Sequence, residues 1–287
     1  MTSDTQVGVP TAAAMNFPPA IWTDGRRRNA AVSSDLVPLT VHMSNPLAAP
    51  SRGAWAATVV LPAYNEEIGL SALLPSLIQL SHDRFEVLVV DDGSTDSTAS
   101  LAESFGCRVV RHAANAGKGV AVRTGLMAAR GEKVIIMDAD DTYPVEAVLE
   151  IIDRLDDWEM VVGARTLGRK NIPLLNRFGN AVLTSAIRLA SGSRWTDPLT
   201  GLYGLRRSVL KRLDLRSTGF SLEAEIAIKS VGLGLRVVDH PIVYRARAGA
   251  SKLHPVRDGI RIAAVINSLG MQRLARSCVQ SIAPLFR

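Results

Sequence analysis

FEVLVVDDGSTDST, residues 85–98, is the stretch that best predicts the fold of this chain. Its first six residues are mostly apolar and rich in valine, as in a strand buried within a sheet. Asp91 and Asp92 end that run, and a glycine turn leads from them into a predicted helix that ends near Phe105. A buried strand that passes directly into a helix is the repeating unit of an α/β fold.

The same alternation continues on both sides of this stretch. Further strands are predicted at TVVLP (58–62), CRVVR (107–111), KVIIMD (133–138) and MVVGA (160–164). Helices are predicted at Ile68–Leu80, Val120–Ala129 and Pro144–Leu155. Near-continuous apolar strands that alternate with helices predict an α/β, Rossmann-like, mainly parallel sheet with helices on both faces.

The second half of the chain has a less regular pattern. We predict helices at 174–190 and 221–234, a turn-rich segment at WTDPLTGLYGLR (195–206), and late strands at 235–238 and 242–244. A basic amphipathic helix is predicted from Gly259 to Ala275. Its apolar side chains fall toward one side and its arginines around the margins, as in a helix lying in an anionic membrane interface; these are Ile262, Val265, Ile266 and Leu269, and Arg257, Arg261, Arg273 and Arg276. The alternative is an ordinary terminal helix packed on the domain.

Composition divides the chain into three predicted regions. Residues 1–55, rich in Ala, Pro, Ser and Asn, are expected to be a disordered arm; residues 56–254 form the folded domain, and residues 255–287 form the basic C-terminal helix region. The net charge is +6, but from Gly204 onward fifteen Lys or Arg stand against five Asp or Glu. Such a basic block suits nucleic acid, an anionic membrane surface or a phosphorylated substrate.

Cysteine usage and hydropathy predict the compartment. Cys107 and Cys278 match no disulfide framework and no metal spacing, which favours a reducing environment, and Cys107 is expected to be buried near a strand. No apolar run approaches the roughly 18 residues of a membrane-spanning helix, and the N-terminal residues lack the pattern of a secretory signal peptide, so export is not expected. We therefore expect a cytoplasmic protein.

Polar side chains follow three of the predicted strands at the point where each strand ends. They are Asn65 and Glu66 after the first strand, Asp91 and Asp92 after the second, and Asp138 and Asp140 after the fourth. Ligands of open α/β sheets bind at the carboxyl ends of the strands, so these side chains should converge on one crevice.

Asp138 and Asp140 have the chemistry of a metal site. A hard cation such as Mg²⁺ or Mn²⁺ prefers oxygen ligands and commonly bridges a carboxylate to a diphosphate. It would neutralise charge on a departing nucleotide diphosphate. On its own this pair is a weak signal, because acidic residues are common at strand ends. Asp91 and Asp92 likewise have two interpretations, which are compatible: they could bind a base or ribose hydroxyl, and Asp92, Ser94 or Thr95 could cap the following helix.

Four motifs in order, PAYNEE (62–67), VVDDGSTDST (89–98), NAGKGVAVRTG (115–125) and MDADDTYP (137–144), resemble the family 2 glycosyltransferases with the GT-A fold. The resemblance implies that Asp138 and Asp140 hold Mg²⁺ or Mn²⁺. It also implies nucleotide contacts from Pro62, Tyr64, Glu66, Asp91, Asp92, Lys118, Gly119, Asp138, Ala139 and Asp140.

Later segments, at 161–180, 196–210 and 220–253, look like the dolichol-phosphate mannose synthase group, which loads a polyprenyl phosphate. An acceptor that is itself a phosphate needs cations rather than a strong base, and Arg165, Arg177, Arg247 and Lys252 match the basic positions of that group. Taken singly, each arginine has a solvated or salt-bridged structural role as its alternative.

Two departures from this group stand out. Asp141, Thr142 and Tyr143 replace its usual Leu-Gln-His or Leu-Ser-His, so a third acid could bind the metal or cap the helix from Pro144. The closing basic motif has altered spacing, which leaves Arg245 and Arg247 as competitors for one role. The Gln-x-x-Arg-Trp signature of processive synthases is missing, which favours transfer of a single sugar.

Three further acids are candidates on the acceptor side. By resemblance, Asp197 should position the acceptor, or act as a base if the acceptor is a hydroxyl; its alternative is a turn-forming residue before Pro198. Glu223 and Glu225 should point to different faces of their helix, and we expect Glu225 to face the site.

The sequence thus predicts an inverting glycosyltransferase that moves one sugar from a nucleotide-sugar donor to a polyprenyl phosphate. We expect it to lie peripherally on the inner membrane face, where a small membrane protein could be its partner. The alternatives are a soluble family 2 enzyme that glycosylates a hydroxyl of a small or phosphorylated acceptor, and a non-catalytic nucleic-acid- or membrane-binding protein. Nucleic acid is not an expected partner, because aromatic residues for base stacking are scarce.

Overall fold

The computed structural model describes residues 42–44, 55–82, 84–247 and 252–282, of which 42–44 and 274–282 are described by their backbone. Most of the predicted N-terminal arm therefore lies outside the described residues. Residues 42–44 differ from the expectation of disorder, because they form strand β1 (His42–Ser44), which pairs antiparallel with β4.

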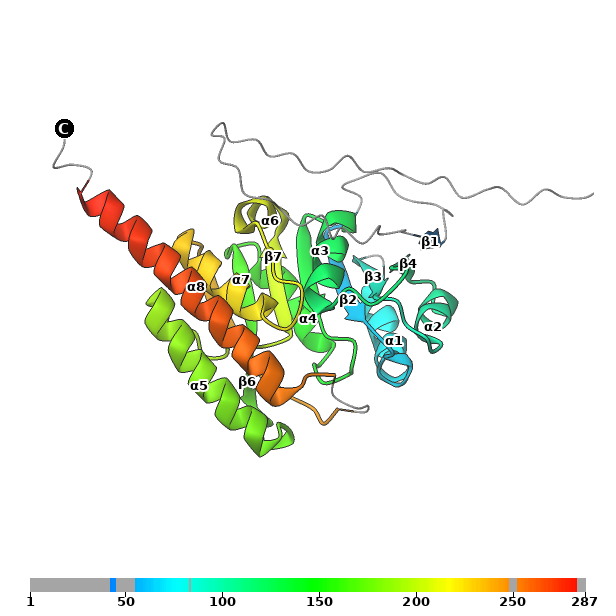
Figure 1. The fold of residues 1–287 in the computed structure, drawn as a ribbon. Coiled ribbons are helices and arrows are strands. Elements are labelled where there is room, and N and C mark those ends of the chain that lie inside the picture. The colour runs from blue at the N-terminus through cyan, green and yellow to red at the C-terminus, as the bar shows by residue number, and fades with distance from the viewer. Residues whose placement is uncertain (1–41, 45–54, 83, 248–251, 283–287) are drawn as a thin grey trace, which may run out of the picture.

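One eight-stranded sheet runs through the molecule (Figure 1). Its strands after β1 are β2 (Ala57–Ala63), β3 (Phe85–Asp91), β4 (Arg108–Arg111), β5 (Lys133–Met137), β6 (Met160–Leu167), β7 (Leu202–Arg206) and β8 (Val237–Val243). Their order is β1-β4-β3-β2-β5-β7-β6-β8. β2 pairs parallel with both β3 and β5, and β3 with β4, as the alternating pattern predicted.

Strand β7 corrects the prediction of a turn-rich segment at 195–206. It lies between β5 and β6 and is antiparallel to both. Gly204, in the middle of the strand, hid its strand character; a Cβ there would overlap the side chain of Ile151, so the glycine lets a helix pack closely on the sheet. The two predicted late strands are one strand, β8, at the edge of the sheet. Pro241 interrupts its pattern but is tolerated, because an edge strand has fewer backbone partners to satisfy.

Helices cover both faces of the sheet, as predicted. One face is covered by α1 (Glu67–Ser81), α2 (Thr98–Ser104) and α4 (Glu146–Arg154), which pack on strand side chains such as Val59 and Ile135. The other face is covered by α3 (Lys118–Ala128), α5 (Leu174–Ser191), α6 (Arg207–Leu213), α7 (Leu222–Gly232) and α8 (Pro255–Ile282). A short 3₁₀ helix, η1 (Arg169–Asn171), precedes α5. Alternate residues of each strand therefore enter two separate apolar cores.

The long helices α5 and α8 lie side by side at one end of the sheet (Figure 1). α8 is longer than predicted. The prediction of which side of this helix meets a membrane is partly wrong, because Ile262 and Ile266 are buried in the core with α7. No helix in the described ranges is long and apolar enough to cross a membrane.

Candidate active site

A pocket of about 330 Å³ opens at the carboxyl ends of β2, β3 and β5. Ten of the sequence-predicted site residues line it: Pro62, Tyr64, Glu66, Asp92, Lys118, Asp138, Ala139, Asp140, Arg247 and Lys252. Five do not line it: Asp91, Gly119, Arg165, Arg177 and Asp197. Sequence reasoning missed the other residues of the wall, which are Ala63, Asn115, Gly117, Ala121, Phe220 and Leu253.

Asp138 and Asp140 follow the last residue of β5 and stand at the centre of this site. The amide of Asp138 donates to the carbonyl of Gly201 at 3.1 Å. Asp140 is buried, and its Oδ1 accepts hydrogen bonds from the amide and hydroxyl of Thr142 at 3.2 and 2.6 Å. Burial, together with the nearby Asp138 charge, raises the pKa of Asp140 despite the opposing effects of Arg247 and Thr142.

Two cations neutralise these two carboxylates. Lys118 Nζ lies 2.7 Å from Oδ1 of Asp138 and 2.6 Å from Oε1 of Glu223. Burial alone would lower the pKa of Lys118, but the two carboxylates raise it above its ordinary value. Arg247 Nη1 lies 2.7 Å from Oδ2 of Asp140. Each aspartate therefore has its own basic partner, drawn from a distant segment of the chain.

The aspartate pair fits a hard divalent cation. Within the described ranges, no three His, Cys, Asp or Glu side chains form a metal site by themselves. Two neighbouring carboxylates, Asp138 and Asp140, are instead the donor set that Mg²⁺ or Mn²⁺ uses when water and diphosphate oxygens complete its shell. Gly201 leaves the room that this set needs, because a Cβ there would overlap Oδ2 of Asp138.

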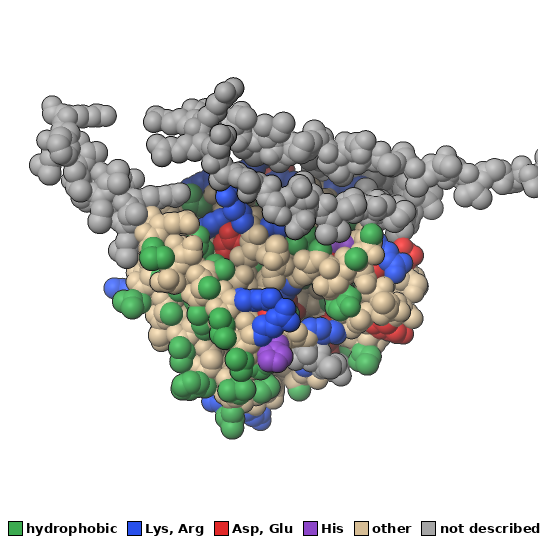
Figure 2. Space-filling view, in the orientation of Figure 1, with side chains coloured by type: hydrophobic (Ala, Val, Ile, Leu, Met, Phe, Trp, Pro, Cys, Tyr) green, Lys and Arg blue, Asp and Glu red, His purple; other side chains and the backbone are tan. Residues whose placement is uncertain are grey.

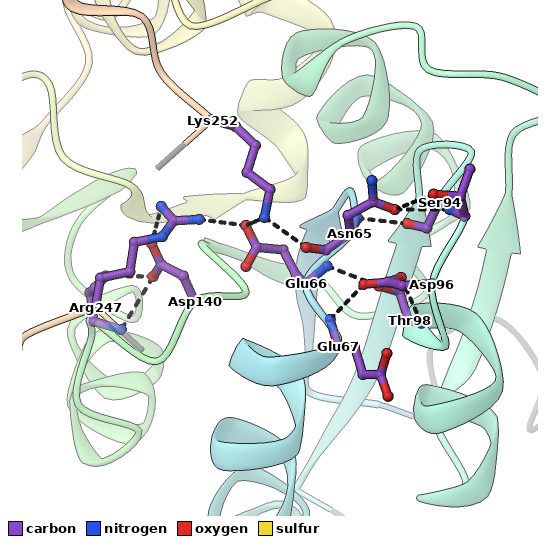
Figure 3. A network of polar contacts seen from close by, with 11 residues as sticks. Asn65, Glu66, Glu67, Ser94, Asp96, Thr98, Asp140, Arg247 and Lys252 are labelled. Atoms are coloured by element: carbon purple, nitrogen blue, oxygen red, sulfur yellow. Dashed lines mark hydrogen bonds and ion pairs between the residues drawn. The ribbon is translucent and has the colours of Figure 1, made fainter. Parts of the chain in front are cut away.

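The loop after β2 is fixed by the loop after β3 (Figure 3). Asn65, whose φ of 51° is in the left-handed region, accepts from the amide of Thr95 at 2.8 Å and donates its own amide to the hydroxyl of Ser94 at 2.9 Å. The amide of Glu66 donates to the hydroxyl of Thr98 at 2.9 Å. These bonds hold Glu66 at the pocket wall.

Glu66 connects that loop to the C-terminal part of the domain (Figure 3). Its Oε1 lies 2.5 Å from Arg247 Nη2 and 3.0 Å from Lys252 Nζ, and Lys252 also donates to the carbonyl of Asn65 at 2.6 Å. Burial raises the pKa of Glu66, although both cations oppose that shift. The structure thus shows Glu66 positioning two basic side chains at the pocket.

Asp92 organises the loop that precedes α3. It accepts from the amides of Ala116 and Gly117 at 3.0 and 2.8 Å and from Nδ1 of the buried His112 at 2.7 Å. The capping interpretation is wrong, since the N-cap of α2 is Ser97 and no side chain caps it. His112 was missed because a lone histidine after a strand carries no sequence signal.

Asp91 and Gly119 act behind the pocket wall. Asp91 accepts from the amide of Ser94 and pairs with Arg111, both at 2.9 Å. The amide of Gly119 donates to the carbonyl of Thr218 at 2.9 Å, and any side chain at Gly119 would overlap the backbone of the 217–218 segment. Gly119 therefore lets this segment, which leads to Phe220, approach α3.

The prediction that Glu225 rather than Glu223 faces the site is wrong. Glu223 holds Lys118, whereas Glu225 accepts from the amides of Arg216 and Ser217 at 2.9 and 2.7 Å. Glu225 also pairs with Lys229 at 2.6 Å. Both glutamates are buried, but only Glu223 reaches the basic group beside Asp138.

Arg165 and Asp197 form a buried ion pair behind the pocket. Two guanidinium nitrogens of Arg165 lie 2.6 and 2.8 Å from the two carboxylate oxygens of Asp197. Burial alone would raise the pKa of Asp197, but the hydrogen bonds and charge of Arg165 lower it below its ordinary value. Arg165 also stacks over Tyr244, with the guanidinium carbon 5.4 Å from the ring centroid.

The two departures from the expected motifs have structural explanations. Tyr143 is buried, and its hydroxyl accepts from the amide of Gly201 at 2.6 Å, which ties the aspartate loop to the segment before β7. Asp141 does not cap α4, whose N-cap is Val145. It lies 3.8 Å from Arg245, which points away from the pocket toward Glu146.

Arg245 and Arg247 therefore do not compete for one position, because only Arg247 lines the pocket. Arg177 is exposed on α5 and does not line the pocket either. Cys107 is buried beside β4 as expected, and burial raises the pKa of its thiol to about 12.

Residues 58–214 match the glycosyl transferase family 2. A dolichyl-phosphate hexose transferase of Haloferax volcanii is 35% identical over 207 residues, which cover 71% of this chain and 89% of that protein. A dolichol-phosphate mannosyltransferase of Pyrococcus furiosus is 31% identical over 208 residues, which cover 68% of this chain and 58% of that protein.

Solved structures resemble the whole domain. The glucosyl-3-phosphoglycerate synthase of Mycobacterium tuberculosis, in complex with Mn²⁺, uridine-diphosphate-glucose and phosphoglyceric acid, superposes with a TM-score of 0.61 at 25% identity and covers 78% of this chain and 80% of its own. The expected GT-A fold is confirmed, and so is the expectation of an enzyme. The family match and the similarity to the Haloferax volcanii transferase show that the chain belongs to glycosyl transferase family 2 and is a glycosyltransferase.

Proposed function

We propose that this protein transfers one sugar, with inversion, from a nucleotide diphosphate sugar to a polyprenyl phosphate, and that it depends on Mg²⁺ or Mn²⁺. The observation that carries the proposal is that every carboxylate lining the described pocket already accepts from a cation or from amides. Asp138 has Lys118, Asp140 has Arg247, Glu66 has Arg247 and Lys252, and Asp92 has its backbone amides. Such a pocket offers no free base but several cations, and so suits an acceptor that is already ionised.

The donor would lie between the loop after β2 and the start of α3. Asp92 fixes the amides of the 116–117 turn, and Phe220 and Ala121 supply apolar wall for a base. Asp138 and Asp140 would hold the metal, which supplies positive charge to the departing diphosphate. Lys118, held beside Asp138, would add a second positive charge on that side.

The acceptor phosphate would be held by Arg247 and Lys252, which Glu66 positions at the pocket. A phosphate ester carries its negative charge near neutral pH, so attack on the anomeric carbon needs orientation and charge screening rather than proton removal. The oxygen would attack from the face opposite the diphosphate, which inverts the anomeric centre. Asp197 is not needed as a base in this scheme, because Arg165 holds both of its oxygens.

The names of two relatives support the lipid acceptor, since both act on dolichyl or dolichol phosphate. A polyprenyl phosphate resides in a bilayer, so the proposal places the protein peripherally on the cytoplasmic membrane face. A small membrane protein is the partner to seek if the lipid in vesicles is not a substrate.

A second candidate is transfer to a small phosphorylated acceptor. The similar synthase of Mycobacterium tuberculosis was solved with phosphoglyceric acid, and the basic side chains of this pocket would bind such an anion equally well. In that case the acceptor hydroxyl would need a base, and the pairing of the pocket carboxylates argues against it.

A donor and acceptor panel tests the two candidates. Radiolabelled GDP-mannose, UDP-glucose and UDP-N-acetyl hexosamines would be incubated with either polyprenyl phosphate or phosphoglyceric acid, in Mg²⁺ or Mn²⁺, for wild type and Asp140→Ala. Labelled lipid from one donor, lost in the variant, supports the proposal. Labelled phosphoglycerate without labelled lipid overturns it in favour of the second candidate.

A further inference from the structure

Large apolar side chains gather on the exposed surface of α5 and the start of α8. The six that define this apolar face are Leu174 (78% exposed), Leu175 (63%), Phe178 (71%), Val182 (52%), Val256 (63%) and Ile260 (67%). Figure 2 shows apolar side chains clustered on this part of the molecule, next to Lys and Arg side chains. A group of this size on one surface is unusual for a protein that meets only water.

Helix geometry places the six side chains on one surface. Leu174, Phe178 and Val182 recur every four residues on α5, and Val256 and Ile260 do the same on α8, so each set forms a stripe along its helix. The two helices are in contact, and Gly270 of α8 approaches Ala190 of α5. In Figure 1, α5 and α8 start at the same end of the pair, so the two stripes, which lie in the first turns of each helix, begin at that end.

The charge around this face has one sign. No Asp or Glu occurs between Leu167 and Thr196, a range that contains η1 and α5. The only acid of α8 is Asp258, which is buried and accepts from the amide of His254. The exposed charged side chains here are basic and include Arg169, Lys170, Arg177, Arg188 and Arg257. Exposed apolar groups among cations complement an anionic lipid surface.

The opposite side of α8 packs on the domain. Ile262 and Ile266 are 5% and 4% exposed and pack in the core against α7. α8 therefore attaches to the domain by one side and presents the other side with α5. The face that could meet lipid is composed mainly of α5 residues, which the sequence pattern of the C-terminal helix did not indicate.

We propose that the apolar face formed by α5 and α8 inserts into the headgroup region of an anionic bilayer. This inference rests on the proposed lipid acceptor and identifies the surface that brings the pocket to it. Lys252 and Leu253 line the pocket, and α8 begins at Pro255, two residues later. Insertion of the start of α8 would therefore hold the cations of the pocket near the plane of the lipid phosphates.

Vesicle co-sedimentation of the full chain tests the docking face. The variants are Phe178→Glu and Ile260→Glu, one on each helix, and their combination; the control is Met127→Glu on α3, which replaces a side chain that is 74% exposed on a different helix. Wild type and control should bind phosphatidylglycerol vesicles more strongly than phosphatidylcholine vesicles. The double variant should lose at least about tenfold in partition coefficient, since it removes two apolar side chains from the face proposed to insert and adds two charges of the same sign as the lipid.

A second readout separates this inference from the proposed reaction. Transfer to a short, water-soluble polyprenyl phosphate in detergent should be equal in wild type and the double variant, because neither substituted residue lines the pocket. Equal vesicle binding by all variants would overturn the docking face and leave the reaction untouched. Vesicle binding without any lipid glycosylation would overturn the reaction instead. A wild-type dimer that dissociates in the double variant, with no vesicle binding, would assign the face to a second copy of the chain.

Discussion

Arg247 Nη1 lies 2.7 Å from Oδ2 of Asp140, the carboxylate that we propose as a metal ligand. The other guanidinium nitrogen, Nη2, lies 2.5 Å from Glu66. The arginine thus balances the buried Asp140 and the half-buried Glu66 in the pocket as it stands. If a metal and a diphosphate bind here as proposed, they bring a competing cation and a competing anion, and Arg247 would then exchange a carboxylate for a phosphate.

Arg247→Ala is expected to lower kcat/KM for transfer by about 10- to 100-fold, as is usual for the loss of a charge-assisted hydrogen bond. The matched control is Arg245→Ala, because Arg245 is close in sequence but pairs with Asp141 and Glu146 outside the pocket. Steady-state measurement of kcat/KM for both variants tests this expectation. Equal losses in the two would show that Arg247 has no special role at the pocket.

Gly201→Ala should impair metal binding without unfolding the protein. A Cβ at this position would overlap Oδ2 of Asp138, so the carboxylate must move. We expect at least about a tenfold rise in the Mn²⁺ concentration for half-maximal activity, since a carboxylate ligand tolerates little displacement. Isothermal titration of Mn²⁺ with nucleotide diphosphate measures the same effect without turnover.

Gly232→Ala is the control for that substitution, because no heavy atom lies within 4 Å of a Cβ at Gly232. Its metal response should equal that of wild type. Unchanged metal affinity in Gly201→Ala would remove Asp138 from the proposed metal site.

Glu223→Gln and Glu225→Gln form a matched pair, since only Glu223 contacts Lys118. Glu223→Gln should lower kcat/KM about tenfold or more, because Lys118 would pair with Asp138 alone and oppose a metal there. Glu225→Gln should leave kcat/KM within about twofold and instead reduce the free energy of unfolding by about 1–3 kcal/mol, because Glu225 accepts from two amides. Kinetics and urea denaturation of both variants measure these effects.

The pH dependence of unfolding provides a further check on Glu225. Burial alone would raise its pKa, but Lys229 and the amide of Ser217 lower it below the ordinary 4.5. The folded state therefore favours the ionised form, and the stabilisation is fully present above pH 4.5 and is lost as the pH falls through the lower folded pKa. The difference in unfolding free energy between wild type and Glu225→Gln should shrink below pH 4.5. A constant difference from pH 7 to pH 3 would contradict this assignment.

The sequence was most informative where local pattern and burial agree. The strands from Thr58 to Met137 are continuous apolar runs, so both their existence and their parallel pairing were predictable. The position of β7 was not predictable, because Gly204 and a preceding turn resemble a loop, and because antiparallel insertion between β5 and β6 depends on distant partners. Non-local pairing of this kind has no periodic signature.

In the site, too, local patterns were predictable from the sequence and contacts between distant segments were not. Six polar side chains at strand ends were predicted to converge, and four of them, Glu66, Asp92, Asp138 and Asp140, line one pocket, whereas Asn65 and Asp91 do not line it. Spacing along a helix could not determine which of Glu223 and Glu225 meets Lys118, because this depends on how α7 is rotated against the sheet. The role of His112 depends on a contact with Asp92 across two segments, which composition cannot reveal.

Asp197→Ala should be one of the most destabilising single substitutions in the domain. Asp197 holds the guanidinium of Arg165 with two hydrogen bonds, and both side chains are buried, so the variant leaves an uncompensated charge in the interior. We expect a loss of about 3–5 kcal/mol in the free energy of unfolding. The double variant Arg165→Met/Asp197→Leu removes both charges and should recover much of that loss, because an apolar pair of similar volume avoids the cost of burying ions. Urea denaturation of the two variants measures the difference. If Asp197→Ala instead kept wild-type stability while abolishing transfer, Asp197 would be a catalytic base with a free carboxylate, and the acceptor would be a hydroxyl rather than a phosphate.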